Sequence, residues 1–112
     1  MNTQSFSAED YKRALISVTL TKNEKKMLQV HYSALDRTLS ILDLSRQAGY
    51  DHINGFNSVY GHLAKKIAHS LDPRPFDYYV EYLCSFSRIE SGLLVTMNEE
   101  FARALKELGY VR

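Results

Sequence analysis

Apolar side chains recur at helical spacing through the first part of the chain. The first stripe follows the cap signal Ser7-Ala8-Glu9-Asp10 and predicts a helix over residues 8–18. The second follows Thr21-Lys22-Asn23-Glu24, which matches a capping box, and predicts a helix up to about residue 35. The positions expected to face the core are Tyr11, Ala14, Leu15 and Val18 in the first helix and Met27, Leu28, His31, Tyr32 and Leu35 in the second.

Two further helices are expected before the first proline. Ser40 is placed to cap a short helix that turns Leu44 toward the core and ends near Ala48-Gly49, where glycine suits a helix C-terminus. A longer helix over residues 54–70 has the most regular period in the chain. Its expected core positions are Phe56, Val59, Tyr60, Leu63 and Ile67, and those of the short helix are Ile41, Leu42 and Leu44.

The pattern changes after Asp72-Pro73-Arg74-Pro75, because two prolines interrupt any helix there. Apolar and polar residues alternate over residues 78–87, which predicts a strand. A turn over residues 89–92, a returning strand over residues 93–97 and a helix capped by Asn98 and ended by Gly109 follow. The expected inward residues are Val80, Tyr82, Cys84 and Phe86 in the strand and Phe101, Ala104, Leu105 and Leu108 in the helix.

This order of elements predicts an α+β domain, mainly α, with a winged helix-turn-helix architecture. The 112 residues suffice for one domain, residues 1–112. It divides into a helical part with the helix-turn-helix (1–71), a β-hairpin wing (76–97) and a C-terminal helix (98–110). The connection over residues 50–55 is longer than the usual tight turn of this motif.

Charge excludes one class of nucleic-acid binder. The chain has 14 basic and 13 acidic residues, a net charge of +1, so it is not a histone-like protein that coats polyanions. Residues 37–71 carry four basic and two acidic side chains, whereas residues 72–112 carry five basic and seven acidic ones. The local positive excess therefore lies on the segment that holds the helix of residues 54–70.

The single cysteine and the short apolar runs predict where in the cell the protein is found. Cys84 is the single cysteine, which excludes an intramolecular disulfide and favours a reducing cytoplasm. The polar N-terminus lacks the pattern of a signal peptide, and no apolar run approaches the about 18 residues that span a membrane. We therefore expect a cytoplasmic protein with no membrane partner.

Motifs for catalysis are not found in the sequence. Cys84 lies on the strand face expected to be buried, which suits a structural thiol better than a nucleophile. His62 and His69 are seven residues apart, or about 10 Å along a helix axis, which is too far for one metal ion. Neither a GxSxG elbow nor a glycine-rich phosphate loop is found. We expect no catalytic residue, no metal site, no cofactor and no enzymatic activity.

The outward face of the helix over residues 54–70 is polar and basic. Asparagine can read adenine with two hydrogen bonds, serine and histidine reach base edges or phosphates, and lysine suits phosphates. An outward helix face is also polar when it meets only water, and a hairpin that closes a core needs no ligand, so both interpretations stay open. The candidate DNA-binding residues are Asn54, Asn57, Ser58, His62, Lys65, Lys66 and His69 on the helix, and Arg88 on the hairpin.

Three stretches of the sequence resemble a known family. Leu44-Ser45-Arg46-Gln47-Ala48-Gly49-Tyr50 and the later run Asn57–Ala64, with the ending Met97–Val111, are similar to a small bacterial domain found alone or joined to HNH-type endonucleases. The resemblance covers residues 20–112 and implies a winged-helix module associated with DNA defence or mobile elements. The HNH nuclease motif itself is not present, so the resemblance implies no nuclease activity. It assigns no base-reading residue either.

Two functions follow as hypotheses. The first is a DNA-binding domain that acts as a regulator or as the targeting module of a defence or mobile-element system, with double-stranded DNA as its partner. The second is a small inhibitor, encoded by a phage or mobile element, that uses the same scaffold to block a host protein. Exposed tyrosines are efficient protein-contact residues, and Tyr50, Tyr78, Tyr79 and Tyr110 have no obvious burial. A homodimer through the first or the last helix is a further possibility.

Overall fold

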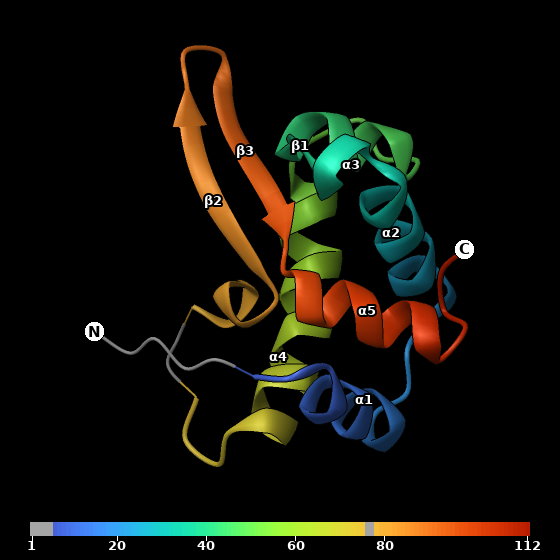
Figure 1. The fold of residues 1–112 in the computed structure, drawn as a ribbon. Coiled ribbons are helices and arrows are strands. Elements are labelled where there is room, and N and C mark those ends of the chain that lie inside the picture. Colours follow the sequence, from blue (N-terminus) through green and yellow to red (C-terminus); the bar gives the residue numbers. More distant parts are fainter. Residues whose placement is uncertain (1–5, 76–77) are drawn as a thin grey trace.

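The computed structural model describes residues 6–75 and 78–112 (Figure 1). The helices at the N-terminal end begin as the caps predict. Ser7 and Asp10 form a capping box at the start of α1 (Ala8–Ser17), and Thr21 and Glu24 form one at the start of α2 (Lys22–Ser33). Each box satisfies two backbone N–H groups that the first turn of a helix leaves without partners.

The later helix boundaries also match the expected ones. The Ser40 hydroxyl accepts from the Asp43 N–H at 3.0 Å and caps α3 (Ile41–Gln47). The Asn98 side chain accepts two N–H groups and caps α5 (Glu99–Glu107), and Gly109 ends this helix with φ = +82°. Leucine or alanine would be strained at that angle, whereas glycine adopts it freely.

The helix predicted over residues 54–70 is confirmed and contains an unexpected π-helical turn. Residues 54–55 are helical, η2 (Phe56–Tyr60) is the π turn, and α4 (Gly61–Leu71) completes the helix. Phe56 and Tyr60 are both buried in this wider turn, with ring centroids 5.1 Å apart. Val59, expected in the core, is only half-buried.

The sheet has three antiparallel strands in the order β1-β3-β2. β2 (Cys84–Ile89) and β3 (Gly92–Met97) form the predicted hairpin, with Ile89 opposite Gly92 across the turn. β1 (Thr38–Ser40) pairs with the other side of β3 and was not predicted. Three residues are too few for an alternating pattern to be visible in the sequence.

The strand predicted from Tyr78 is wrong over its first half. Residues 79–82 form the 3-10 turn η3 (Tyr79–Tyr82), which packs against α4, and β2 begins only at Cys84. Side chains repeat every three residues in such a turn, whereas they alternate every two residues in a strand. The alternation expected before Cys84 is therefore lost, and Leu83, expected to face outward, is fully buried. Residues 76 and 77 of the predicted hairpin lie outside the described residues.

Three single-residue expectations are also corrected. Phe86 is 37% exposed because β2 extends beyond the helices at that point, where its ring meets Phe56 edge to face at 6.3 Å. Leu35 is 87% exposed because α2 ends at Ser33 and the 3-10 turn η1 (Leu35–Arg37) breaks the helical phase. His31, expected at the edge of the core, is fully buried.

The helices pack around one core, and the hairpin projects from one side of it (Figure 1). α5 crosses in front of α4 in this view, α1 lies below it, and α2 and α3 lie on the side away from the hairpin. The fold is therefore α+β and mainly helical, with a small antiparallel sheet. The largest fully buried side chains are Tyr11, Leu15, Met27, Leu28, Leu44, Tyr60, Leu63, Ile67, Leu83, Met97, Phe101 and Leu105.

Candidate nucleic-acid interface

The connection between α3 and the helix of residues 54–71 is held by backbone hydrogen bonds. Gly49, with φ = +102°, donates to the Arg46 carbonyl at 3.0 Å, and Tyr50 donates to the Ser45 carbonyl at 2.9 Å. These two bonds form a Schellman motif, which ends α3 sharply. The chain then crosses residues 50–53 before the next helix begins.

A buried serine ties the two helices directly. The Ser45 hydroxyl, on α3, accepts from the Phe56 N–H at 2.9 Å, and Ser45 is fully buried. Gly55 lies beside this bond, and a Cβ atom there would come within 2.5 Å of the Tyr50 side chain. The long connection is thus fixed by a hydrogen bond and by close packing, and it sets the direction of the second helix.

The predicted outward face of this helix is solvent-exposed. Asn54 and Asn57 lie near its start, Ser58 and His62 follow, and Lys65 and His69 lie toward its end; all six are exposed. The structure brings part of this set together in one place. Ser58, His62, Lys65 and Lys66 line a hollow of about 400 Å³ with Thr21, Asn23 and Glu24 from the start of α2.

Lys66 differs from its neighbour because its ammonium group is already bound within the protein. Its Nζ donates to a Glu24 carboxylate oxygen at 2.7 Å and to the Thr19 carbonyl at 2.6 Å. Glu24 is buried, with a side chain 5% exposed, and both partners of this ion pair line the hollow. Lys65 is exposed and leaves its charge toward the solvent. The phosphate contact expected of Lys66 stays a prediction, and its bonds brace α4 against α2.

A second hollow lies on the other side of the helix, toward the hairpin. Asn57 and Gly61 line it together with Phe86 and Leu93 of the hairpin and Tyr78 before η3, and its volume is about 380 Å³. Gly61 leaves open space, since nothing lies within 4 Å of the position a Cβ would take. The exposed face therefore lies between a polar hollow on one side and an apolar hollow on the other.

Three candidate residues, Asn54, His69 and Arg88, line neither of these two hollows. The His69 ring meets the Tyr79 ring at 5.5 Å, which places it beside η3. Arg88 is exposed on β2, opposite Leu93, near the tip of the hairpin. The structure does not place Arg88 in either of the two hollows that flank the helix.

A chain of buried hydrogen bonds holds the helix of residues 54–71 on its core side. The Cys84 thiol donates to the Tyr60 hydroxyl at 3.4 Å, and that hydroxyl lies 3.0 Å from His31 Nδ1. His31 Nε2 lies 3.2 Å from the Val95 carbonyl, which can only accept. His31 therefore carries its proton on Nε2, and Tyr60 donates to Nδ1. Burial lowers the pKa of His31 to about 4 and raises the pKa of Cys84 to about 12, so both groups are neutral.

Asn23 is a candidate that the sequence did not reveal. It is exposed at the start of α2 and lines the same hollow as His62 and Lys65. The capping box identifies the start of α2 from sequence, but the packing of that start beside the helix of residues 54–71 is a tertiary feature. No local pattern carries this information.

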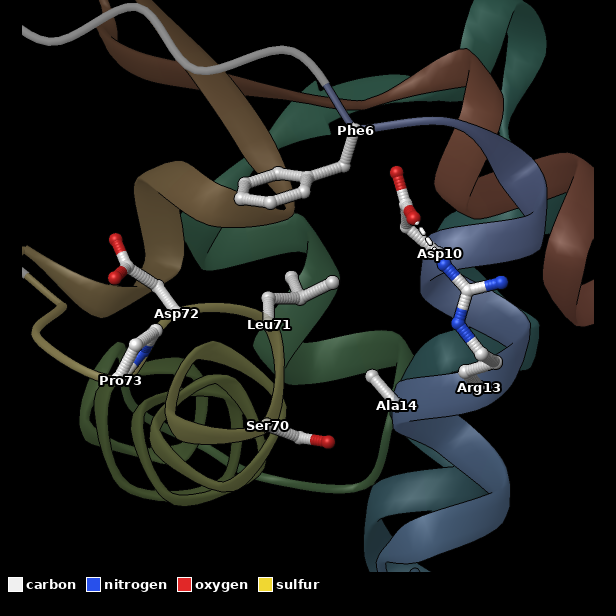
Figure 2. A pocket seen from close by; sticks show the side chains of 8 residues that line it. All are labelled: Phe6, Asp10, Arg13, Ala14, Ser70, Leu71, Asp72 and Pro73. Atoms are coloured by element: carbon white, nitrogen blue, oxygen red, sulfur yellow. Dashed lines mark hydrogen bonds and ion pairs between the residues drawn. The ribbon is translucent and has the colours of Figure 1, made fainter.

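A further hollow of about 700 Å³ lies near the end of α4. Figure 2 shows its lining side chains, with Asp10 and Arg13 on one side, Asp72 and Pro73 on the other, and the Phe6 ring and Leu71 between them. Its charged groups have partners within the protein. Asp10 pairs with Arg13, and the Asp72 carboxylate accepts from the Tyr82 hydroxyl at 3.1 Å.

Within residues 6–75 and 78–112, no three His, Cys, Asp or Glu side chains are grouped so that they could hold a metal ion. In the same ranges, no helix has the length and apolar character needed to cross a membrane. Comparison with protein-family models, curated proteins and solved structures gives no match to this chain. The resemblance to the domain found with HNH-type endonucleases stays a prediction.

Proposed function

We propose that this chain binds double-stranded DNA as a winged helix-turn-helix domain. In this proposal the helix of residues 54–71 enters the major groove and the β2–β3 hairpin lies along the backbone as a wing. The observation that carries it is the position of the exposed helix face beside the β2–β3 hairpin. The helix follows α3 after a fixed connection, and the hairpin belongs to a sheet of order β1-β3-β2.

The exposed side chains divide into two groups by their chemistry. Asn54, Asn57 and Ser58 can hydrogen-bond base edges near the start of the helix. Lys65 carries a free charge suited to a phosphate, and Arg88 on the hairpin suits a phosphate or the minor groove. His62 and His69 lie between these groups and can bind either a base edge or a phosphate.

Such a domain would act as a regulator or as the targeting module of a bacterial or phage defence or mobile-element system. This part of the proposal is supported by the sequence resemblance given above. The chain then supplies recognition, and any cleavage of DNA belongs to another polypeptide or domain.

A titration of fluorescent duplexes of varied sequence at low salt tests DNA binding. Lys65→Ala should weaken binding about fivefold, which corresponds to the loss of about one phosphate contact. Lys106→Ala is the matched control, because Lys106 is also exposed but lies on α5, outside the proposed interface. The proposal fails if no duplex binds at low salt, or if the two variants weaken binding equally.

Protein binding is the second candidate function, and the apolar hollow beside the hairpin favours it. Tyr78 at its rim is 71% exposed, whereas Tyr50, Tyr79 and Tyr110 are half-buried. An exposed tyrosine beside an apolar hollow is typical of a protein contact. This candidate gains weight if the duplex titration is negative while Tyr78→Ala leaves the fold intact.

A further inference from the structure

The outer edge of β2 has no partner strand among the described residues. In the order β1-β3-β2, β2 pairs with β3 on one side only, and no described element lies beyond it (Figure 1). Five of its six residues are exposed, from Ser85 to Ile89. An unpaired edge presents a row of backbone N–H and C=O groups that another strand can bind.

The features that usually protect such an edge are few in β2. The register with β3 is unbroken from Cys84 to Ile89, so the strand has no bulge, and it contains no proline. Its single charged residue is Arg88, and its exposed apolar residues are Phe86 (37%) and Ile89 (44%). The opposite edge strand, β1, has only three residues. The edge of β2 is therefore suited to pairing.

The hairpin geometry identifies which backbone groups point outward. Ile89 and Gly92 close a two-residue turn, so they form a hydrogen-bonded pair. Bonded and non-bonded pairs alternate along an antiparallel ladder. The N–H and C=O groups of Cys84, Phe86 and Arg88 consequently point away from β3, toward the open edge.

We propose that a second copy of this chain pairs its β2 with this edge, antiparallel and about a two-fold axis at Ser87, to form a six-stranded sheet. This register sets Phe86 opposite Arg88 of the second copy, which allows cation–π contacts, and joins their outward backbone groups in hydrogen bonds. Ser87 meets Ser87 of the second copy, and its small side chain permits close approach. An axis at Arg88 instead sets two guanidinium groups opposite each other, and an axis at Phe86 sets Arg88 against the buried Cys84.

The proposed dimer places both helices of residues 54–71 on one side of the continuous sheet, because the two-fold axis of an antiparallel strand pair is perpendicular to the sheet. Two copies of the exposed helix face would then be related by two-fold symmetry, as a palindromic duplex requires. The dimer itself does not depend on DNA binding, and it is measured without DNA.

Light scattering after size exclusion, over a series of concentrations, tests the association. The full chain should approach twice its 12.9 kDa mass as concentration rises. Arg88→Pro should remain monomeric, because proline lacks the outward N–H that the second copy would bind. The substitution leaves the hydrogen bonds between β2 and β3 in place, because the N–H of residue 88 does not bond to β3. Arg88→Ala keeps that N–H and should still dimerise. A wild-type chain that is monomeric throughout, or an Arg88→Pro variant that dimerises normally, overturns the proposal.

Cysteine cross-linking tests the register and stands even if Arg88→Pro does not fold. Directly opposed residues of a non-hydrogen-bonded pair have Cα atoms about 4.5 Å apart, within disulfide range. Ser87→Cys should therefore oxidise to a covalent dimer. Ser85→Cys is the matched control, because its two copies would lie about 13 Å apart along the strands. Equal oxidation rates for the two variants overturn the two-fold register. The dimer proposal also fails if the chain stays monomeric and its β2 edge pairs with a strand of another protein instead.

Discussion

His31 is the residue whose position is most sensitive to acid. Its ring is fully buried between Tyr60 and the Val95 carbonyl, and no carboxylate of residues 6–75 or 78–112 is bonded to it. Protonation would place a positive charge in the core and would remove the acceptor that the Tyr60 hydroxyl needs. The folded protein therefore holds this imidazole neutral.

Stability should fall as pH falls from 7 to 5. The pKa of His31 is about 4 in the folded protein and about 6.5 in an unfolded chain, so the unfolded chain takes up the proton first. The stabilisation is fully present above pH 6.5 and is lost toward pH 4, with a loss of about 2 kcal/mol between pH 7 and 5. Urea unfolding at several pH values measures it.

Two variants separate this effect from other titrations. His31→Gln should be less stable than the wild type at pH 7 but should show little change in unfolding free energy between pH 7 and 5. His62→Gln changes an exposed ring and should keep the wild-type pH dependence. A wild-type unfolding free energy that is constant over this range would contradict the assignment to His31.

Lys65 and Lys66 are adjacent in sequence but should differ in their effect on stability. Lys66→Ala leaves the buried Glu24 carboxylate without its counterion and should lower the unfolding free energy by about 1–3 kcal/mol. Lys65→Ala should change it by less than about 0.5 kcal/mol, since the side chain is exposed. Denaturant unfolding measures both, and equal losses would contradict the brace.

At the scale of elements, the helix of residues 54–71 contains two glycines in opposite surroundings. Both have right-handed helical angles, with φ = −60°. Gly55 lies against Tyr50, where a Cβ atom would meet ring and Cβ atoms at 2.5 Å, whereas Gly61 has open space. The same substitution should therefore act in opposite directions at the two positions.

Gly55→Ala should destabilise the fold by about 1–3 kcal/mol through overpacking. Gly61→Ala should stabilise it by about 0.5–1 kcal/mol, because alanine loses less backbone entropy in a helix. Thermal unfolding of the two variants side by side provides the comparison. A loss of stability in Gly61→Ala would show that this position does not tolerate a side chain after all.

Elements with local signals could be predicted from sequence. The capping pairs and the glycines at 49 and 109 act within one helix turn, so the helix boundaries they predict agree with the structure. β1 and η3 depend on packing against β3 and α4, and no period within three or four residues reveals such contacts. The exposure of Phe86 could not be predicted for the same reason, because it depends on how far β2 extends beyond the helices.

For the candidate site, periodicity placed the exposed side of the helix correctly but could not identify the bonds that its side chains make. Asn54, His62 and Lys65 are exposed as a helical projection expects. Lys66 has the same polar character in sequence, yet it is bonded to Glu24, 42 residues away. Its role follows from the packing of α2 beside α4, which sequence spacing does not contain.

At the scale of the whole molecule, the number of phosphate contacts determines how strongly salt can affect DNA binding. The proposed interface offers few free cations, chiefly Lys65 and Arg88. The slope of log affinity against log salt concentration should lie between about −2 and −4, as expected for two to four phosphate contacts. Titrations at several salt concentrations measure it. A slope steeper than about −6 would show that a larger basic surface binds the DNA.

The buried chain of hydrogen bonds has a consequence for how the domain opens. It starts at Cys84 on β2, passes through Tyr60 and His31, and ends at Val95 on β3, so it joins the hairpin to two helices. Lifting the hairpin from the helices would break this chain of buried hydrogen bonds and leave polar groups unpaired. We therefore expect the hairpin and the helices to unfold as one cooperative unit, so the amide hydrogens of β3 and α4 should exchange with solvent through the same global unfolding event.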